Sequence, residues 1–172
     1  THCPYGTQAE KGFIPIMKTL GDSVDAQIRF VHYFLHDPEE SETPRQICIR
    51  EEQPTRFLPY LECFLEEGNS DKCISQTSVD KAKMQQCIDN GNADKYYAED
   101  SRLSQAYGVR GSPTLIINGV ESSAGRSAAS YLSGVCNVFN SAPGSCDKEL
   151  SSTNPSPGFG YSTTPTTGAA TA

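Results

Sequence analysis

The chain alternates between segments with a helical period of apolar residues and one segment with the composition of a β-strand. Apolar residues recur at helical spacing over residues 9–20, which predicts a helix that ends at Gly21-Asp22. Residues 26–35 are rich in β-branched and aromatic side chains, and an extended chain would place apolar residues on both of its faces. A strand of this kind is typical of a sheet that is covered on both sides.

Between residues 38 and 107 the apolar positions predict a run of helices. Thr43-Pro44 has the residue types of a helix cap and first turn, and residues 68–71 interrupt the helical pattern. A last helix of this run is predicted over residues 95–108. This part of the chain is therefore expected to be a helical insert that follows the strand.

A second change of pattern comes after the insert. The apolar run at residues 115–117 leads into Asn118-Gly119, which is typical of a strand followed by a tight hairpin turn. Helical spacing of apolar residues then predicts a closing helix over residues 127–139. A mixture of strands and helices in this order indicates an α/β fold.

The last part of the chain, residues 141–172, is rich in Ser, Thr, Pro and Gly and has almost no charge after Glu149. Such a composition cannot build a core of its own. We expect one domain over residues 1–140, with the helical insert at about 38–107. Residues 141–172 are expected to be a flexible tail or linker whose hydroxyl groups are candidate sites of O-glycosylation.

The net charge of −7 limits the kinds of partner that the chain can have. An acidic protein is repelled by nucleic acid and by anionic membrane surfaces, so neither is an expected partner. The sequence also contains no apolar run long enough to span a bilayer.

The chain has seven cysteines and no closely spaced CxxC pair of the zinc-binding kind. We therefore expect structural disulfides rather than a metal site, and an oxidising setting that is secreted, lumenal or at the cell surface. An odd number leaves one thiol unpaired, and Cys3 is the candidate. The cysteines that remain for disulfides are Cys48, Cys63, Cys73, Cys87, Cys136 and Cys146.

Cys3 has a position that favours nucleophilic chemistry. It stands where a loop enters the first predicted helix, beside unpaired backbone N–H groups and the positive end of the helix dipole, which stabilise a thiolate. Pro4 suits the first helical turn, where its missing N–H costs nothing, and it fixes the angle at which Cys3 is presented.

The segment Cys3-Pro4-Tyr5, entering a helix, resembles the active site of the thioredoxin superfamily, and of glutaredoxins in particular. Residues 111–114, Gly-Ser-Pro-Thr, followed by a strand and a hairpin turn, resemble the cis-proline loop of the same superfamily. Together the two motifs identify residues 1–140 as a thioredoxin-like α/β domain.

The resemblance implies roles for the residues of both motifs. Cys3 would be the nucleophile, and Pro4 and Tyr5 would shape the approach to it. The cis-proline loop would face Cys3 and hold an extended protein or peptide substrate by backbone pairing. The loop residues concerned are Ser112, Pro113 and Thr114.

Two further residues are weaker candidates for a role in the active site. Arg110, just before the loop, is either a surface residue or a group that steers an anionic thiol such as glutathione. His32 matches a histidine of DsbA-type oxidoreductases in its approximate place, although a histidine in a strand more often makes a satisfied hydrogen bond in the core.

The place of the helical insert resembles DsbA-type oxidoreductases, and the cysteine distribution is similar to that of gamma-interferon-inducible lysosomal thiol reductases. The dithiol site and the Cys-Gln-His-Gly signature of those reductases are absent here. Four insert cysteines permit three pairings. We favour Cys63–Cys73 across the predicted turn and Cys48–Cys87 between the first and last insert helices, with a local bridge between Cys136 and Cys146.

Gly6 stands where dithiol members have their second cysteine, so the site resembles a monothiol one. A lone cysteine forms a mixed disulfide that glutathione, another small thiol, a partner protein or a distant cysteine of the chain must resolve. Thiol-disulfide exchange by reduction, isomerisation or glutathione-linked transfer is the expected function. The alternatives are a redox-inactive structural or assembly subunit, and glutathione transfer to small electrophiles.

A thioredoxin sheet also has a central strand that ends directly before the active-site cysteine, whereas Thr1 and His2 alone precede Cys3 here. We expect this strand to come from residues upstream of Thr1 in a longer chain, or from a neighbouring copy or a partner in trans. The Thr-rich end of the tail is a candidate donor, although its prolines disfavour a central position.

Overall fold

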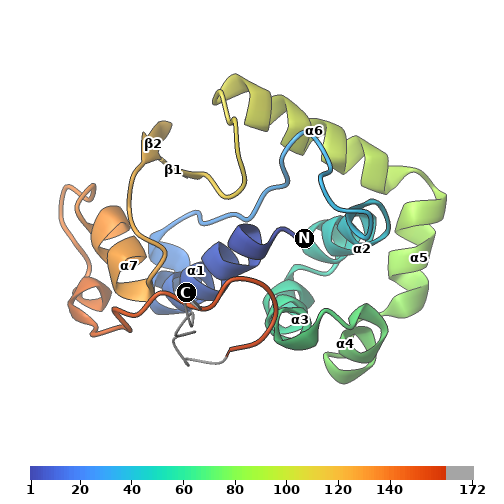
Figure 1. Ribbon diagram of the computed structural model, residues 1–172, viewed down its shortest axis with the longest axis horizontal. Coiled ribbons are helices and arrows are strands. Elements are labelled where there is room, and N and C mark those ends of the chain that lie inside the picture. Colours follow the sequence, from blue (N-terminus) through green and yellow to red (C-terminus); the bar gives the residue numbers. More distant parts are fainter. Residues whose placement is uncertain (162–172) are drawn as a thin grey trace, which may run out of the picture.

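Helix α1 (Pro4–Leu20) runs through the middle of the molecule between two groups of elements (Figure 1). The computed structural model describes residues 1–161 and has a thioredoxin-like α/β fold that is mostly helical. After α1 the elements are η1 (Gly21–Ser23), α2 (Glu39–Glu52), α3 (Pro54–Glu67), α4 (Ser70–Gln76), α5 (Lys81–Asp89), α6 (Asn92–Ala106), β1 (Leu115–Ile117), β2 (Val120–Ser122), α7 (Ala128–Cys136) and η2 (Gly144–Asp147).

The hairpin predicted at Asn118-Gly119 is confirmed. Strands β1 and β2 pair in antiparallel fashion, with Leu115 opposite Ser122 and Ile117 opposite Val120. Asn118 and Gly119 both have positive φ angles, 48° and 84°, which is the requirement of the tightest hairpin turns.

Two hydrophobic cores lie on opposite sides of α1. One is formed by the insert helices α2–α6, and α1 contributes Ile14 to it. The other lies between α1 and α7, where Ile16 and Leu20 pack with Tyr131 and Leu132. Because α1 is shared by both cores, the position of its N-terminal end depends on both halves of the molecule.

Helix α2 begins earlier than the predicted cap at Thr43. Its first residue, Glu39, is buried, and the carboxylate accepts hydrogen bonds from the backbone N–H groups of Leu35 and His36 at 2.8 and 3.3 Å. These bonds fix the chain ahead of the helix and allow it to begin at Glu39, while Pro44 lies inside the first turns.

The strand predicted over residues 26–35 is wrong, because the structure has irregular chain there. Side chains of the insert take backbone bonds that a neighbouring strand would have made. The Arg50 guanidinium donates to the carbonyl of Ile28 at 2.8 Å, and the Phe30 N–H donates to Asp100 at 3.0 Å. The hydroxyl of Tyr97 donates to the carbonyl of Val31 at 2.9 Å.

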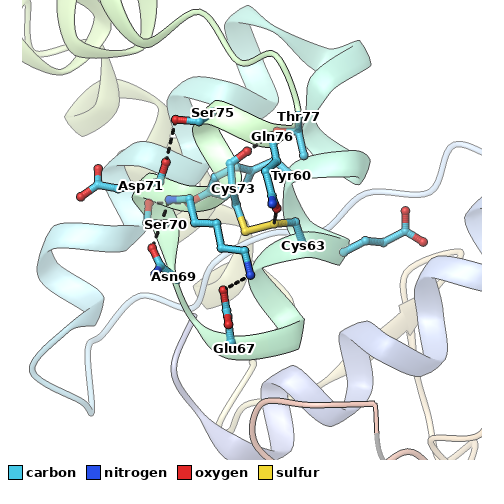
Figure 2. Close-up of a disulfide and its surroundings, with 12 residues drawn as sticks. Tyr60, Cys63, Glu67, Asn69, Ser70, Asp71, Cys73, Ser75, Gln76 and Thr77 are labelled. Carbon is cyan, nitrogen blue, oxygen red and sulfur yellow. Dashed lines mark hydrogen bonds and ion pairs between the residues drawn. A yellow bond between two sulfur atoms is a disulfide. The ribbon is translucent and has the colours of Figure 1, made fainter.

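Three disulfides join the pairs of cysteines that the sequence favoured. Cys63–Cys73 links α3 to α4, the helix that Asn69 caps, and Figure 2 shows the bond between the two helices. Cys136–Cys146 links α7 to η2, and Cys48–Cys87 links α2 to α5 rather than to the last insert helix. These bridges suggest an oxidising, extracellular or lumenal environment.

The tail packs against the domain as far as the structure describes it. From η2 it runs past α1 to α3, as the red segment of Figure 1 shows. Residues 162–172, which include the Thr-rich end considered above as a strand donor, lie outside the described residues. Within residues 1–161, no helix has the length and apolar composition needed to cross a membrane.

Replacing Asp100 with Asn should strongly destabilise the fold. The Asp100 carboxylate is fully buried and accepts two hydrogen bonds from Arg50, at 2.7 and 3.0 Å, and one from Arg29 at 2.8 Å. Loss of its charge removes the one fully buried partner of Arg50 and leaves both arginines with Glu51, a partly exposed carboxylate. Breaking a buried ion pair costs up to about 3 to 5 kcal/mol. Urea unfolding would measure the change in the free energy of unfolding.

The matched control is Glu99→Gln on the same helix. Glu99 pairs with Arg102 at the surface, and exposed ion pairs contribute little, so this variant should unfold like the parent protein. Equal midpoints for Asp100→Asn and Glu99→Gln would contradict the importance of the buried pair.

Candidate active site

Cys3 is the N-cap residue of α1, and Pro4 is the first residue of the helix. The carbonyl of Cys3 already accepts the first helical hydrogen bond, from the N–H of Thr7 at 2.9 Å. Cys3 is half-buried and is the one free cysteine among residues 1–161. A thiol is therefore held at a helix start, where free N–H groups and the helix dipole favour a negative charge.

The loop at residues 111–114 lies against this thiol, as the sequence motif implied. The Cys3 thiol donates to the carbonyl of Ser112 with an Sγ–O distance of 3.6 Å, and the Ser112-Pro113 peptide bond is cis. The hydroxyl of Thr114 donates to the carbonyl of Gly111 at 2.8 Å and closes the loop on itself.

Gly6 lies where helix α1 and the loop at residues 111–114 approach each other closely. A Cβ atom at this position would lie 3.2 Å from Ser112 Oγ and 3.3 Å from Cys3 Cβ. Both distances are shorter than ordinary van der Waals contact, so the close approach of loop and thiol depends on the missing side chain. A larger residue here would require the loop to shift by a few tenths of an ångström.

Arg126 is a residue of the site region that the sequence analysis missed. Its guanidinium lies 5.0 Å from the ring centre of the exposed Tyr5, within the range of a cation–π contact, and donates to Gln8 at 2.9 Å. Gly12 brings it there, because a Cβ on Gly12 would lie only 2.1 Å from the carbonyl oxygen of Arg126. A glycine inside a predicted helix was the available signal of such a close approach.

Among residues 1–161, neither Arg110 nor His32 makes a hydrogen bond with Cys3 or with the loop at residues 111–114. Arg110 is exposed, and its side chain makes no hydrogen bond or ion pair within residues 1–161. The ring of His32 is hydrogen-bonded through Nδ1 to Ser104 Oγ at 3.0 Å and packs edge-on against Tyr33. Its partners are those of a satisfied core histidine.

A small cavity of about 60 Å³ connects Cys3 with an unexpected carboxyl group. Cys3, Gly6, Ser112, Arg29 and Glu10 are among the residues that line it. Such a volume holds about two water molecules. Glu10 has no ion pair or hydrogen bond among the described residues, and burial raises the pKa of its carboxyl group to about 7. Glu10 was not predicted as a site residue, because a single Glu on a helix normally faces solvent.

A larger cleft of about 910 Å³ opens next to this cavity. Its lining includes residues 24–31, the apolar face of α1 at Phe13 and Ile16, and strand β1. Within the described part of the chain β1 pairs only with β2, so the N–H and C=O groups of its other edge face the cleft region unpaired. No group of three or more metal-ligating side chains occurs among residues 1–161.

Comparison with known proteins finds a match to one family model. The family model described as Thioredoxin matches residues 1–133, a range that contains α1, the whole insert and the loop at residues 111–114. No curated protein matches the chain.

Replacing Glu10 with Gln should change how stability depends on pH. The pKa of Glu10 rises from 4.5 to about 7 on folding, so between these values the folded protein keeps a proton that the unfolded chain releases. The free energy of unfolding of the parent protein must therefore fall as the pH rises through this window. Glu10→Gln should remove this part of the decline and be the more stable protein above pH 7.

Thermal unfolding at pH 4.5, 6 and 8 would measure the effect. The exposed Glu149, replaced with Gln, is the control and should follow the parent curve at every pH. Parallel curves for Glu10→Gln and the parent would show that the Glu10 carboxyl group is as well solvated in the folded protein as in the unfolded chain.

Proposed function

Because the chain belongs to the thioredoxin family, we propose that it catalyses thiol-disulfide exchange through Cys3. The observation that carries the proposal is the free Cys3 thiol at the start of α1, in contact with the Ser112 carbonyl of the cis-proline loop. Pro4 and Tyr5 flank the thiol and shape the approach to it. Ser112, Pro113 and Thr114 hold the substrate by its backbone.

The first step forms a mixed disulfide. The Cys3 thiolate attacks one sulfur of a substrate disulfide, a bond forms between Cys3 and that sulfur, and the other substrate sulfur leaves as a thiolate that takes up a proton from water. The helix start lowers the cost of the negative charge on Cys3 before the attack and again when Cys3 becomes the leaving group.

The second step uses a thiol from another molecule. Gly6 provides no neighbouring thiol, and the other six cysteines of the chain are joined in three disulfides. Glutathione or a similar small thiol attacks the mixed disulfide on the substrate sulfur, which releases Cys3 as a thiolate and leaves the substrate joined to the small thiol. Glutathione is thus a co-substrate, and no bound cofactor takes part.

Within the family we propose a place near the DsbA-type oxidoreductases and the gamma-interferon-inducible lysosomal thiol reductases. Five helices, α2 to α6, separate the segment after α1 from the cis-proline loop, which supports this relationship. The three disulfides support a secreted, lumenal or cell-surface location. Arg110 and His32 are secondary candidates for contacts with the small thiol or the substrate.

We also propose that the cleft beside β1 receives an extended strand, supplied by residues upstream of Thr1 in a longer chain, by a neighbouring copy or by a partner. The support is the unpaired edge of β1 together with the irregular chain at residues 24–31, which lines the same cleft. A strand between the two would satisfy backbone groups on both sides and cover the apolar face of α1. Protein and peptide disulfides remain the substrates, and they bind at Cys3 instead.

Replacing Cys3 with Ser should abolish glutathione-dependent reduction of an insulin disulfide while the protein stays folded. In the same assay Gly6→Cys should reduce the need for glutathione, because it adds a second thiol next to Cys3. The Cβ atoms of residues 3 and 6 would be 3.3 Å apart, only slightly closer than the about 3.5 to 4.5 Å of disulfides. Equal rates for the parent and Cys3→Ser would favour a structural subunit instead.

The mass of the native protein tests strand donation. A protein that donates a strand to its neighbour should sediment as a multiple of the 18.6 kDa chain. A native mass that equals one chain, or a heavier single chain whose extra residues form the strand, would contradict donation between copies.

A further inference from the structure

The tail ends, within the described residues, in a segment that fits a groove of the domain. We name residues 155–161 the C-terminal strap; its sequence is Pro-Ser-Pro-Gly-Phe-Gly-Tyr. The strap lies between α1 and α3, close to the N-terminal end of α1 (Figure 1). Its contacts are of three kinds: a buried lysine, a pocket for an aromatic ring, and backbone bonds to both helices.

Lys11 is the centre of the groove. Only 4 % of its surface is exposed, and its ammonium group donates to the backbone carbonyls of Ser156, Gly158 and Gly160 at 2.6, 2.8 and 2.6 Å. Burial lowers the pKa of this lysine, and no carboxylate pairs with it among the described residues. The strap therefore supplies the carbonyl acceptors that make the burial of this charge tolerable.

Phe159 is the strap side chain that packs into the groove between α1 and α3. Its ring packs edge-on against His2 and Phe64, with centroid distances of 5.5 and 5.3 Å. The space for it exists because residue 68 is glycine, since a Cβ there would lie 2.8 Å from the ring. A large aromatic residue thus enters a pocket between the two helices, as anchor residues do at peptide-binding sites.

Backbone bonds hold the strap on both sides. The Gly160 N–H donates to the carbonyl of Leu65 in α3 at 2.9 Å, and the Gly158 N–H donates to the carbonyl of Pro4 in α1 at 3.0 Å. Gln8 donates to the carbonyl of Pro155 at 2.7 Å. Both glycines of the strap have positive φ angles, 74° and 94°, which other residues rarely adopt.

These contacts surround the residue that carries the thiol. His2, Pro4 and Gln8 lie on either side of Cys3 in the sequence, and each touches the strap. Without the strap, the start of α1 would lose these bonds and keep the contacts of His2 with Phe64 and Glu39. Helix ends with fewer contacts open more readily.

We propose that the groove between α1 and α3 is a peptide-binding site for an extended Gly- and Pro-rich segment with an aromatic residue between two glycines. The chain fills it with its own strap, and occupancy sets the reactivity of Cys3. This inference extends the proposed function by naming what controls Cys3, but alkylation of the thiol tests it without any exchange reaction.

The main test compares a chain that ends at Asn154 with one that ends at Tyr161. The rate at which iodoacetamide modifies Cys3 at pH 7 should be higher in the shorter chain, on the order of fivefold or more, the factor that one net hydrogen bond is worth. Addition of the synthetic strap peptide should restore the slower rate, and a peptide with Phe159→Ala should not. Equal rates in the two chains, or no restoration by the peptide, would overturn the proposal.

Point variants of the full chain cover the case in which the shorter chain does not fold. Lys11→Met should release the strap, so that chymotrypsin cuts at Phe159 and Cys3 is alkylated faster. Lys18→Met on the same helix is the control, because Lys18 is exposed and pairs with Glu62 at the surface. The same resistance to chymotrypsin and the same alkylation rate in both variants would also overturn the proposal.

Discussion

The burial of α1 on both of its sides is the constraint on which the structure depends. The helix lends Ile14 to the core of the insert and Ile16 to the core with α7, so neither core is complete without it. Gly12 admits the chain at Arg126 to 2.1 Å from the place of its missing Cβ, closer than any side chain would allow. Cys3 is the residue directly before this helix, and its direction is therefore set by packing that takes place about two and a half to three and a half turns away.

Charged side chains make hydrogen bonds to the backbone of residues 28–30 that a neighbouring strand would make in a sheet. Asp100, which is fully buried, and the two arginines that pair with it tie residues 28–30 to α2 and α6. These side-chain bonds hold residues 28–30 in one conformation without a ladder of backbone hydrogen bonds to a neighbouring strand. The same segment, residues 24–31, lines the cleft beside β1.

The sequence was informative where the deciding contacts are local. The start of α1, the turn at Asn118-Gly119, the loop facing Cys3 and the three disulfides follow from short motifs and from cysteine spacing. The strand expected at residues 26–35 failed because its composition suits a strand, while its partners are side chains far away in the sequence. Glu10 and the fit of the strap were not predictable for the same reason, since each depends on a cavity or groove formed by distant segments. For Arg126 the one signal was Gly12, which marks a close approach but does not name the residue that makes it.

The disulfides stabilise the two halves of the molecule separately, and Cys3 lies where the halves meet. Two bridges lie within the insert and the third joins α7 to η2, so no bridge of the described residues connects the halves. The strap makes a separate connection, because the chain before it bonds to α7 at Ser151 and the strap itself bonds to α1 and α3. Movement between the halves is opposed by this segment and by the faces of α1. Cys3 lies at the end of that helix, with the loop at Ser112 on one side and the strap bonded to Pro4 on the other, so a movement between the halves would change the surroundings of its thiol.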